Sequence, residues 1–338
     1  MPRKIVIEQN IPYIKGRLEP WFDSVVYAPA SDIDAALVAD ADAIVTRTRT
    51  RCDAALLDGS AVRLIATATI GTDHIDLDYC RRAGIKVASA PGCNAPAVAQ
   101  WALATILAWQ RARALEGRRL SLGVVGVGHV GSIVARWAGQ LGYEVLPCDP
   151  PRERADGGDR WVSLNTIADR CDIITVHTPL NRHGADATFH LLNERFIGRL
   201  AGDKPRLLMN AARGAIASTQ ALLAAPPHID LAIDCWENEP DIDKVLLQRA
   251  FVATPHIAGY SSQGKLRATA MAIEAVNRHF GIQAEAPSVT LPATGAAKVT
   301  TEGIAASYNP LADTRALKAS PEQFELLRNR YALRDEVH

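Results

Sequence analysis

Short apolar runs alternate with helical segments along most of the chain. In the first 92 residues the segment 33–38 predicts a helix, and four apolar runs predict strands, at 4–8, 43–46, 64–67 and 86–89. Strand–helix alternation of this kind indicates a parallel sheet covered on both faces. Polar groups follow three of these strands, at 47–49, 67–69 and 90–94. Because ligands bind beyond the carboxyl ends of parallel strands, these loops are candidates to line a site.

A long helix comes next and introduces a second set of strands. Asn94 predicts its N-cap, Pro96 lies in its first turn, and its apolar residues keep helical spacing to about Arg113. Six more apolar runs predict strands, at 122–125, 144–148, 173–177, 206–210, 231–234 and 251–254. This is the content of a doubly wound dinucleotide-binding domain. A further helix, 265–280, is expected to cross back to the first domain.

The strand at 122–125 leads into three glycines with the spacing GxGxxG, Gly126, Gly128 and Gly131. In such a turn the first glycine permits a tight bend, the second lets the backbone approach a pyrophosphate, and the third lets helix and strand pack closely. The helix that follows would point free N–H groups at the phosphates. The next strand ends in Asp149, 18 residues past Gly131, close to the distance expected for a carboxylate that binds a ribose diol.

These elements predict an α/β fold of two Rossmann-like or flavodoxin-like parallel-sheet domains joined by crossing helices. We expect a substrate-binding domain at 1–93 and 260–282, an NAD-binding domain at 94–259, and a short C-terminal segment at 283–338. Residues 283–319 lack strong periodicity, whereas 321–331 predict an amphipathic helix with Phe324, Leu327 and Tyr331 on one face. An oligomer contact and a plain surface extension both fit this segment.

Composition excludes several classes of partner. Lysine plus arginine and aspartate plus glutamate balance at 37 each, which gives no support for binding to nucleic acid or to a membrane surface. The six cysteines (52, 80, 93, 148, 171 and 235) are scattered, which indicates reduced thiols in cytoplasm and argues against a zinc site or any other metal site. The N-terminus enters a strand directly, without the apolar region of a signal peptide.

The candidate chemistry lies at the ends of the late strands. Arg213 directly follows the strand at 206–210, where a guanidinium could hold a substrate carboxylate with two parallel hydrogen bonds. Glu239 lies 17 residues before His256, and if their strands are neighbours the carboxylate would favour the charged imidazole. Such a histidine can take a hydroxyl proton as hydride leaves the same carbon. From composition alone, Glu237 competes with Glu239 for this role. Together these features imply oxidation of a 2-hydroxy acid.

The motifs GVGHVG, CDPPR, HTPL, NAARG, DCWENEP and TPHIAGY occur in one order along the chain. This set resembles the D-isomer-specific 2-hydroxyacid dehydrogenase family, over about residues 4 to 280. Within the family, ATATIGTDHID, SAPGCNAPAV and TPHIAGYSSQGK resemble the members that act in vitamin B6 biosynthesis. The resemblance implies NAD-dependent oxidation of 4-phospho-D-erythronate to 2-oxo-3-hydroxy-4-phosphobutanoate, by a homodimer that associates through its C-terminal segment.

The resemblance also implies roles for single residues. Arg213, Glu239 and His256 match the catalytic trio, with His256 as proton donor, which favours Glu239 over Glu237. Thr48, Thr69 and Tyr260 match substrate contacts. The glycine turn and the resemblance together give the expected cofactor-binding residues: Gly126, Gly128, His129, Val130, Gly131, Asp149, Thr178, Ala211, Ala212, Arg213, Asp234 and Gly259. An acid at 149 favours NAD over NADP, because it would repel a 2′-phosphate.

Two questions stay open at this level. The substrate phosphate needs cations, for which Arg47, Arg49, Lys265 and Arg267 are candidates, as are Arg328 or Arg330 from a partner subunit. The alternative functions are oxidation of another 2-hydroxy acid, such as 3-phosphoglycerate, and a non-catalytic NAD-sensing protein of the same fold. A protein of the second kind would not need an intact trio of arginine, glutamate and histidine.

Overall fold

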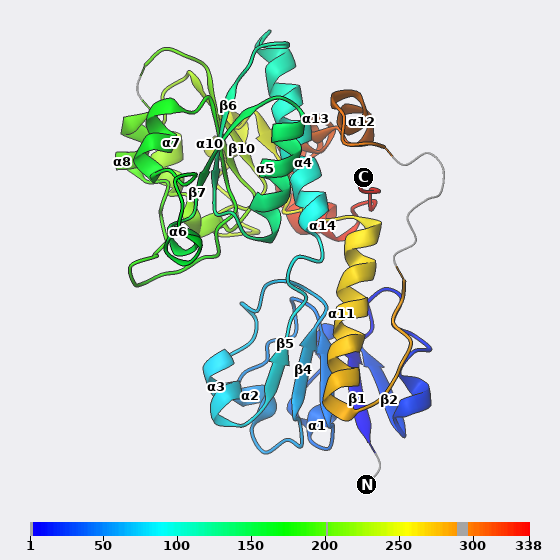
Figure 1. The fold of residues 1–338 in the computed structure, drawn as a ribbon. Helices are drawn as coiled ribbons and strands as arrows, with labels where there is room; N and C mark the ends of the chain where they lie inside the picture. The colour runs from blue at the N-terminus through cyan, green and yellow to red at the C-terminus, as the bar shows by residue number, and fades with distance from the viewer. Residues whose placement is uncertain (1–2, 201, 289–296) are drawn as a thin grey trace. The chain divides into compact units, whose positions relative to one another are not determined.

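The computed structural model describes residues 3–200, 202–288 and 297–338 and divides into two compact units (Figure 1). The first unit comprises Met1–Asn94 and Ser262–Pro292, and the second comprises Ala95–Ser261 and Ala293–His338. Each unit has a parallel sheet and a core of its own. The predicted fold class, two parallel-sheet α/β domains, is therefore confirmed.

The first unit is built on a five-stranded sheet with helices on both faces. Its strands are β1 (Lys4–Glu8), β2 (Ser24–Ala28), β3 (Ala43–Thr46), β4 (Leu64–Thr67) and β5 (Lys86–Ala88). They run parallel in the order β2-β1-β3-β4-β5. The sequence analysis did not predict β2, a half-buried strand at the edge of the sheet. Apolar side chains of α11 (Ser262–Phe280) fill one core, and those of α1 (Ala35–Val38), α2 (Ala54–Leu57) and α3 (Leu77–Arg82) fill the other.

The strand order of the first unit locates its ligand crevice. The chain adds β2 on one side of β1 and then continues with β3 on the other side. In doubly wound sheets, ligands bind outside the carboxyl ends of the strands at such a switch point. Here that point lies between Glu8, the last residue of β1, and the loop that follows Thr46. This loop contains Arg47, Thr48 and Arg49.

The second unit contains a six-stranded sheet, also parallel throughout. Its strands are β6 (Ser121–Val125), β7 (Glu144–Cys148), β8 (Ile173–Val176), β9 (Arg206–Asn210), β10 (Ile229–Ile233) and β11 (Val252–Ala253), in the order β11-β10-β9-β8-β6-β7. One face packs against α4 (Ala95–Ala112) and α5 (His129–Gln140). The other packs against α7 (Leu164–Arg170), α8 (Glu194–Arg199), α9 (Thr219–Leu223) and α10 (Lys244–Arg249). The switch point falls between β6 and β8, at the glycine turn.

The two tryptophans of α4 belong to the core of the second unit. Trp101 and Trp109 are fully buried, and each indole nitrogen donates a hydrogen bond. Trp101 Nε1 donates to Thr254 Oγ1 at 3.2 Å, and Trp109 Nε1 donates to Asp230 Oδ2 at 2.7 Å. A buried indole that also satisfies its polar nitrogen can stabilise a core without a polar penalty.

The C-terminal tail packs on the second unit of its own chain. Its elements are α12 (Thr301–Ser307), α13 (Pro310–Ala319), a 3₁₀ turn (Pro321–Gln323) and α14 (Phe324–Asn329). The sequence up to residue 319 lacks strong periodicity and gave no helix prediction there, yet α12 and α13 form because Thr300 and Asn309 cap these short helices locally. Thr314 Oγ1 accepts from the amide of Ala253 in β11 at 3.0 Å. Residues 289–296 of the predicted tail lie outside the described residues.

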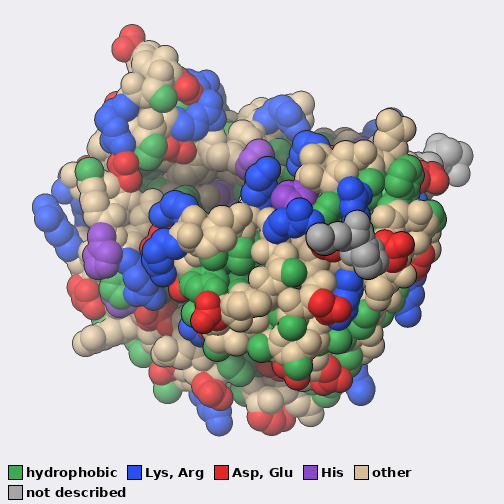
Figure 2. Space-filling view, turned by 90° about the horizontal axis from the view of Figure 1, so that it is seen from below, with side chains coloured by type: hydrophobic (Ala, Val, Ile, Leu, Met, Phe, Trp, Pro, Cys, Tyr) green, Lys and Arg blue, Asp and Glu red, His purple; other side chains and the backbone are tan. Residues whose placement is uncertain are grey.

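Within the described ranges, no helix has both the length and the apolar character needed to cross a membrane. On the face drawn in Figure 2, acidic and basic side chains lie interspersed.

The packing of the tail can be tested at Phe324, which is 1% exposed and lies in the same apolar core as Leu317 and Ala250. Phe324→Ala should destabilise the second unit by about 3–5 kcal/mol, because it leaves a cavity in that core. Denaturant unfolding measures this loss. Val245→Ala is the control, since Val245 is an apolar residue of the second unit that is 68% exposed. Equal unfolding midpoints for the two variants would contradict the docked tail.

Candidate functional site

The glycine turn after β6 has the geometry of a dinucleotide site. Gly126 has a φ of +84°, and a Cβ built there would lie 2.8 Å from the backbone nitrogen of Thr178. A Cβ on Gly131 would collide with the carbonyl oxygen of Gly126, whereas one on Gly128 would meet nothing within 4 Å. The first and third positions therefore require glycine for close packing. The second leaves open space where a ligand can approach the backbone.

Polar groups around the turn are available to a bound dinucleotide. Helix α5 begins after Gly128 without a side-chain cap, so the first N–H groups of this 12-residue helix can bind an anion. Thr178 Oγ1 and His177 Nδ1 are buried and have no hydrogen-bond partner among the described residues. Burial lowers the pKa of His177 to about 3, so this imidazole is neutral. The residues present fit a pyrophosphate and its ribose.

Asp149 ends β7 beside the same turn. Its Oδ2 accepts a hydrogen bond from the amide of Val127 at 2.7 Å, and its Oδ1 accepts one from the amide of Arg152 at 3.1 Å. The carboxylate thus caps α6 (Pro150–Asp156) and fixes the glycine turn at once. His129 and Val130, which the sequence analysis also assigned to the cofactor, form the first turn of α5.

Three neighbouring strands bring the trio of arginine, glutamate and histidine to one edge of the sheet. Arg213 follows β9, Glu239 follows β10 and His256 follows β11. The Arg213 loop contacts the Glu239 loop so closely that a Cβ on Gly214 would collide with the carbonyl of Trp236. The side chain of Asn210 joins the two loops, since its Nδ2 donates to the carbonyls of Arg213 and Cys235 at 2.9 and 3.3 Å. Ala211 and Ala212 form the link between β9 and Arg213.

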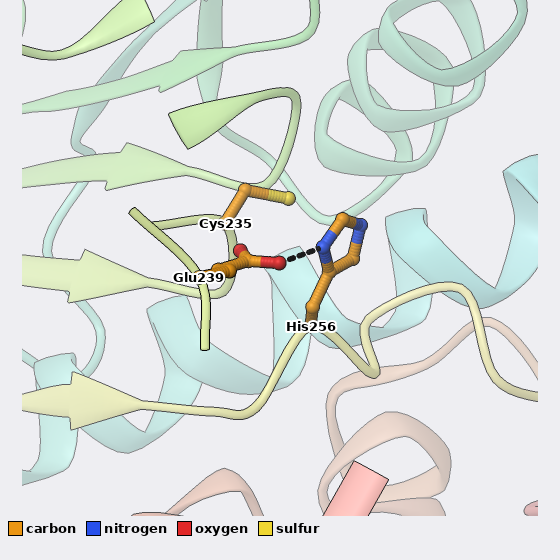
Figure 3. A group of neighbouring side chains, drawn as sticks. All are labelled: Cys235, Glu239 and His256. Atoms are coloured by element: carbon orange, nitrogen blue, oxygen red, sulfur yellow. Dashed lines mark hydrogen bonds and ion pairs between the residues drawn. The ribbon is translucent and has the colours of Figure 1, made fainter. Parts of the chain in front are cut away.

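Glu239 and His256 form a hydrogen-bonded pair (Figure 3). His256 Nδ1 lies 2.8 Å from Glu239 Oε2, and the other oxygen of the carboxylate accepts from the amide of Trp236 at 2.7 Å. The imidazole is 30% exposed and its pair partner 18% exposed, so the second ring nitrogen can reach a ligand. Cys235 Sγ lies beside the pair, and the three groups offer atoms within 4.8 Å of one another. Metal ions can bind such a set, but the hydrogen bond points to proton transfer.

The electrostatics of the pair favour a charged imidazole. Burial alone would lower the pKa of His256, but its neighbours Cys235 and Glu239 raise that pKa well above the ordinary value. Because burial also raises the pKa of Cys235, its thiol is neutral and the carboxylate supplies the charge. Burial tends to raise the pKa of Glu239, yet His256, the Trp236 amide and Arg328 together lower it. The pair is therefore carboxylate and imidazolium over a wide pH range.

Asp234 builds the turn that presents His256. The backbone of His256 has a φ of +56°, a conformation that few non-glycine residues adopt. Asp234 is 1% exposed, and its carboxylate accepts from Thr254 Oγ1 at 2.6 Å and from the amide of Ile257 at 2.8 Å. The amide of Ala258 also donates to it, at 3.1 Å. These bonds hold the strained turn, so the structure gives Asp234 a positioning role. The cofactor contact expected for Asp234 stays a prediction.

The competing carboxylate, Glu237, belongs to a different pair. Its Oε1 lies 2.7 Å from His190 Nε2, and its Oε2 accepts from the amide of Thr219 at 2.7 Å. The geometry therefore separates Glu239, beside His256, from Glu237, beside His190.

The expected substrate contacts lie in both units. Thr48 and Thr69 are in the first unit, in the loops that follow β3 and β4, and the hydroxyls of Thr69 and Thr67 lie 2.8 Å apart. The buried carboxylate of Glu8 accepts from the amide of Arg47 at 2.9 Å and so holds the loop with Thr48. Tyr260 is in the second unit, directly after Gly259 and four residues past His256.

The sequence analysis missed several residues of this region. Asn210, Cys235 and Glu8 act through contacts that join separate loops, and no motif spacing reports such contacts. The sequence offered Arg328 as a candidate from a partner subunit; within its own chain, Arg328 Nε donates to Tyr260 OH at 3.3 Å. The sequence did contain one indication of this contact. The apolar residues Phe324 and Leu327 form one face of the tail helix, and that face packs on the core of the second unit.

Known proteins resemble this chain in sequence and in fold. A family model described as the NAD binding domain of D-isomer specific 2-hydroxyacid dehydrogenases matches residues 98–258. Erythronate-4-phosphate dehydrogenase of Bacteroides thetaiotaomicron is 44% identical, over 98% of this chain and 97% of its own length. The enzyme of the same name from Pseudomonas putida is 38% identical, over 98% of this chain and 93% of its own length.

Solved structures agree on the fold. The crystal structure of D-lactate dehydrogenase from Aquifex aeolicus, complexed with NAD and lactic acid, is 25% identical and has a TM-score of 0.65, over 82% of this chain and 95% of that one. The holo form of Rhodotorula graminis D-mandelate dehydrogenase is 23% identical with a TM-score of 0.67, over 86% and 99% of the two chains. The chain therefore belongs to the D-isomer-specific 2-hydroxyacid dehydrogenase family of NAD-dependent oxidoreductases, and within it to the branch of the erythronate-4-phosphate dehydrogenases.

Proposed function

We propose that the protein oxidises 4-phospho-D-erythronate with NAD to 2-oxo-3-hydroxy-4-phosphobutanoate, a step in the synthesis of pyridoxal 5′-phosphate. The observation that carries the proposal is the hydrogen bond of 2.8 Å between His256 and Glu239, at the sheet edge where Arg213 also lies. The substrate assignment is supported by the 44% identity with a relative of that name along nearly the whole chain. The reaction removes a hydride from C2 of the acid and a proton from the C2 hydroxyl, which together are two electrons and two protons.

Each member of the trio has a distinct task in this reaction. The guanidinium of Arg213 binds the C1 carboxylate of the substrate with paired hydrogen bonds, which fixes C2 and its hydroxyl. His256 accepts the proton of the C2 hydroxyl at the nitrogen that does not face Glu239. The carboxylate of Glu239 stabilises the imidazolium that results and fixes the orientation of the ring. Bound NAD supplies the hydride acceptor.

The residues around the glycine turn would hold the cofactor. The open space at Gly128 and the N-terminus of α5 would take the pyrophosphate, and Asp149 the adenosine ribose. A 2′-phosphate would place two negative groups together at Asp149, which disfavours NADP. We assign Thr178, Ala211, Ala212, Asp234 and Gly259 to the same pocket on the strength of the family motifs.

We further propose that the protein is a homodimer that associates through its C-terminal segment, residues 283–338. This proposal is supported by Leu326 and Leu333, which are 41% and 39% exposed in the described part of the tail. Exposed apolar side chains of this kind are common at subunit interfaces. Light scattering should give twice the chain mass for the parent protein and a smaller mass for the Leu326→Asp, Leu333→Asp double variant. A monomeric parent protein at micromolar concentration would contradict the proposal.

The proposed reaction is tested by NADH formation with 4-phospho-D-erythronate, with 2-oxoglutarate added in a parallel assay that follows the oxidised acid directly. We expect turnover in at least one assay, and a loss of about 10²- to 10⁴-fold in His256→Ala, because this variant lacks the proton acceptor. His183→Ala is the control, since His183 is an exposed residue in a loop. Turnover of 3-phosphoglycerate in place of 4-phospho-D-erythronate would overturn the substrate assignment and leave the reaction type intact.

The pH dependence of oxidation tests the pair. Proton acceptance requires neutral His256, so kcat/KM for oxidation should rise with pH through the raised pKa of this imidazole. Glu239→Gln removes the carboxylate charge, so the rise should move to lower pH while the limiting rate falls. Glu237→Gln is the matched control and should leave the profile in place, because Glu237 pairs with His190. An unmoved profile in Glu239→Gln would contradict the pairing.

A further inference from the structure

The residues assigned so far leave the phosphate of the proposed substrate without a cation. Among the arginines near the crevice of the first unit, Arg47 donates to the carbonyl of Asn10 at 3.2 Å and Arg267 donates to the carbonyl of Cys93 at 2.6 Å. Both are therefore engaged in holding the backbone of that unit. The tail of the second unit offers a different candidate.

Arg328 lies beside the site and belongs to the same chain. From α14 its Nε donates to Tyr260 OH at 3.3 Å, and its Nη1 lies 3.5 Å from Glu325 Oε1. Its Nη2 has no hydrogen-bond partner within the described residues, and its side chain is 21% exposed. It also interacts electrostatically with Glu239, the partner of His256. A partly exposed guanidinium thus faces the region where the acid/base pair lies.

The position of Arg328 is fixed by the fold of the tail. Phe324, one turn earlier on α14, is 1% exposed in the core of the second unit. Tyr260 is fixed as well. Its amide donates to the carbonyl of Ile257 at 2.9 Å, and its ring packs edge-on against that of Tyr331 with the two ring centroids 6.1 Å apart. Arg330 lies two residues beyond Arg328 and is exposed. Of the two, Arg328 is the arginine that contacts Tyr260.

We propose that Arg328 and Tyr260 form an anion-binding subsite for the phosphate of the substrate, supplied by the tail of the same chain. The proposal rests on the proposed function, because it takes the substrate to be a phosphorylated 2-hydroxy acid. The guanidinium offers planar N–H groups that match two phosphate oxygens. The Tyr260 hydroxyl accepts a hydrogen bond from Arg328 Nε and so orients the guanidinium beside the site. The tail then serves recognition of the substrate as well as stability.

The subsite is tested by comparing a phosphorylated acid with its dephosphorylated counterpart. In Arg328→Ala we expect KM for 4-phospho-D-erythronate to rise about tenfold to hundredfold, the loss typical of one charge-assisted contact, and Arg328→Lys to recover part of it. For D-erythronate, kcat/KM should stay within about twofold of the parent value, since no phosphate is present. Arg330→Ala is the matched control and should resemble the parent protein with both acids. NAD affinity, from quenching of tryptophan fluorescence, should not change.

Two outcomes would overturn the subsite. An equal loss of kcat/KM on both acids would show that Arg328 acts on the His256–Glu239 pair, and an unchanged KM would show that it does not bind the phosphate. Failure of the proposed function is distinguishable: the parent protein would then turn over another acid. In that case 3-phosphoglycerate and glycerate replace the pair of substrates, and inorganic phosphate is measured as a competitive inhibitor. If the subsite is correct, the inhibition constant of inorganic phosphate must be higher for Arg328→Ala than for the parent protein.

Discussion

The hydrogen bond between His256 and Glu239 is the interaction on which the chemistry of this protein depends. A histidine accepts a proton from an alcohol efficiently only when the imidazolium that forms is stabilised. Here a carboxylate at 2.8 Å provides that stabilisation in a partly buried site, where an ion pair is stronger than in water. The bond exists because β10 and β11 are parallel neighbours whose carboxyl ends lie at one edge of the sheet.

Much of the surrounding structure serves to hold this pair in place. Asp234 is buried, and it uses its carboxylate to fix a backbone turn with a φ of +56° at His256. Asn210 and the close approach at Gly214 bring the Arg213 loop against the Glu239 loop. The tail contributes as well, since α14 places Arg328 next to Tyr260. The cost of the strained turn is therefore offset by hydrogen bonds that also orient the imidazole.

The sequence predicts well the features that depend on local pattern. The strands other than β2, the glycine turn and the trio at three strand ends follow from apolar periodicity, turn chemistry and spacing. Glu239 could not be separated from Glu237 on that basis, because the two differ only in the partner that the folded loop gives them. The helices α12 and α13 were missed because they are short and are specified by caps and by packing on the second unit. The contact between Arg328 and Tyr260 joins residues 68 apart in sequence, and no local rule reports it.

The central claim is that the protein removes hydride from C2 of a 2-hydroxy acid while His256 takes the proton of the hydroxyl. The most direct measurement is the fate of deuterium placed at C2 of 4-phospho-D-erythronate, followed by mass spectrometry of the NADH that forms. The account predicts one deuterium in the nicotinamide ring for each acid oxidised, and a slower rate than with the unlabelled acid. NADH without deuterium would contradict it, because the hydride would then come from another carbon.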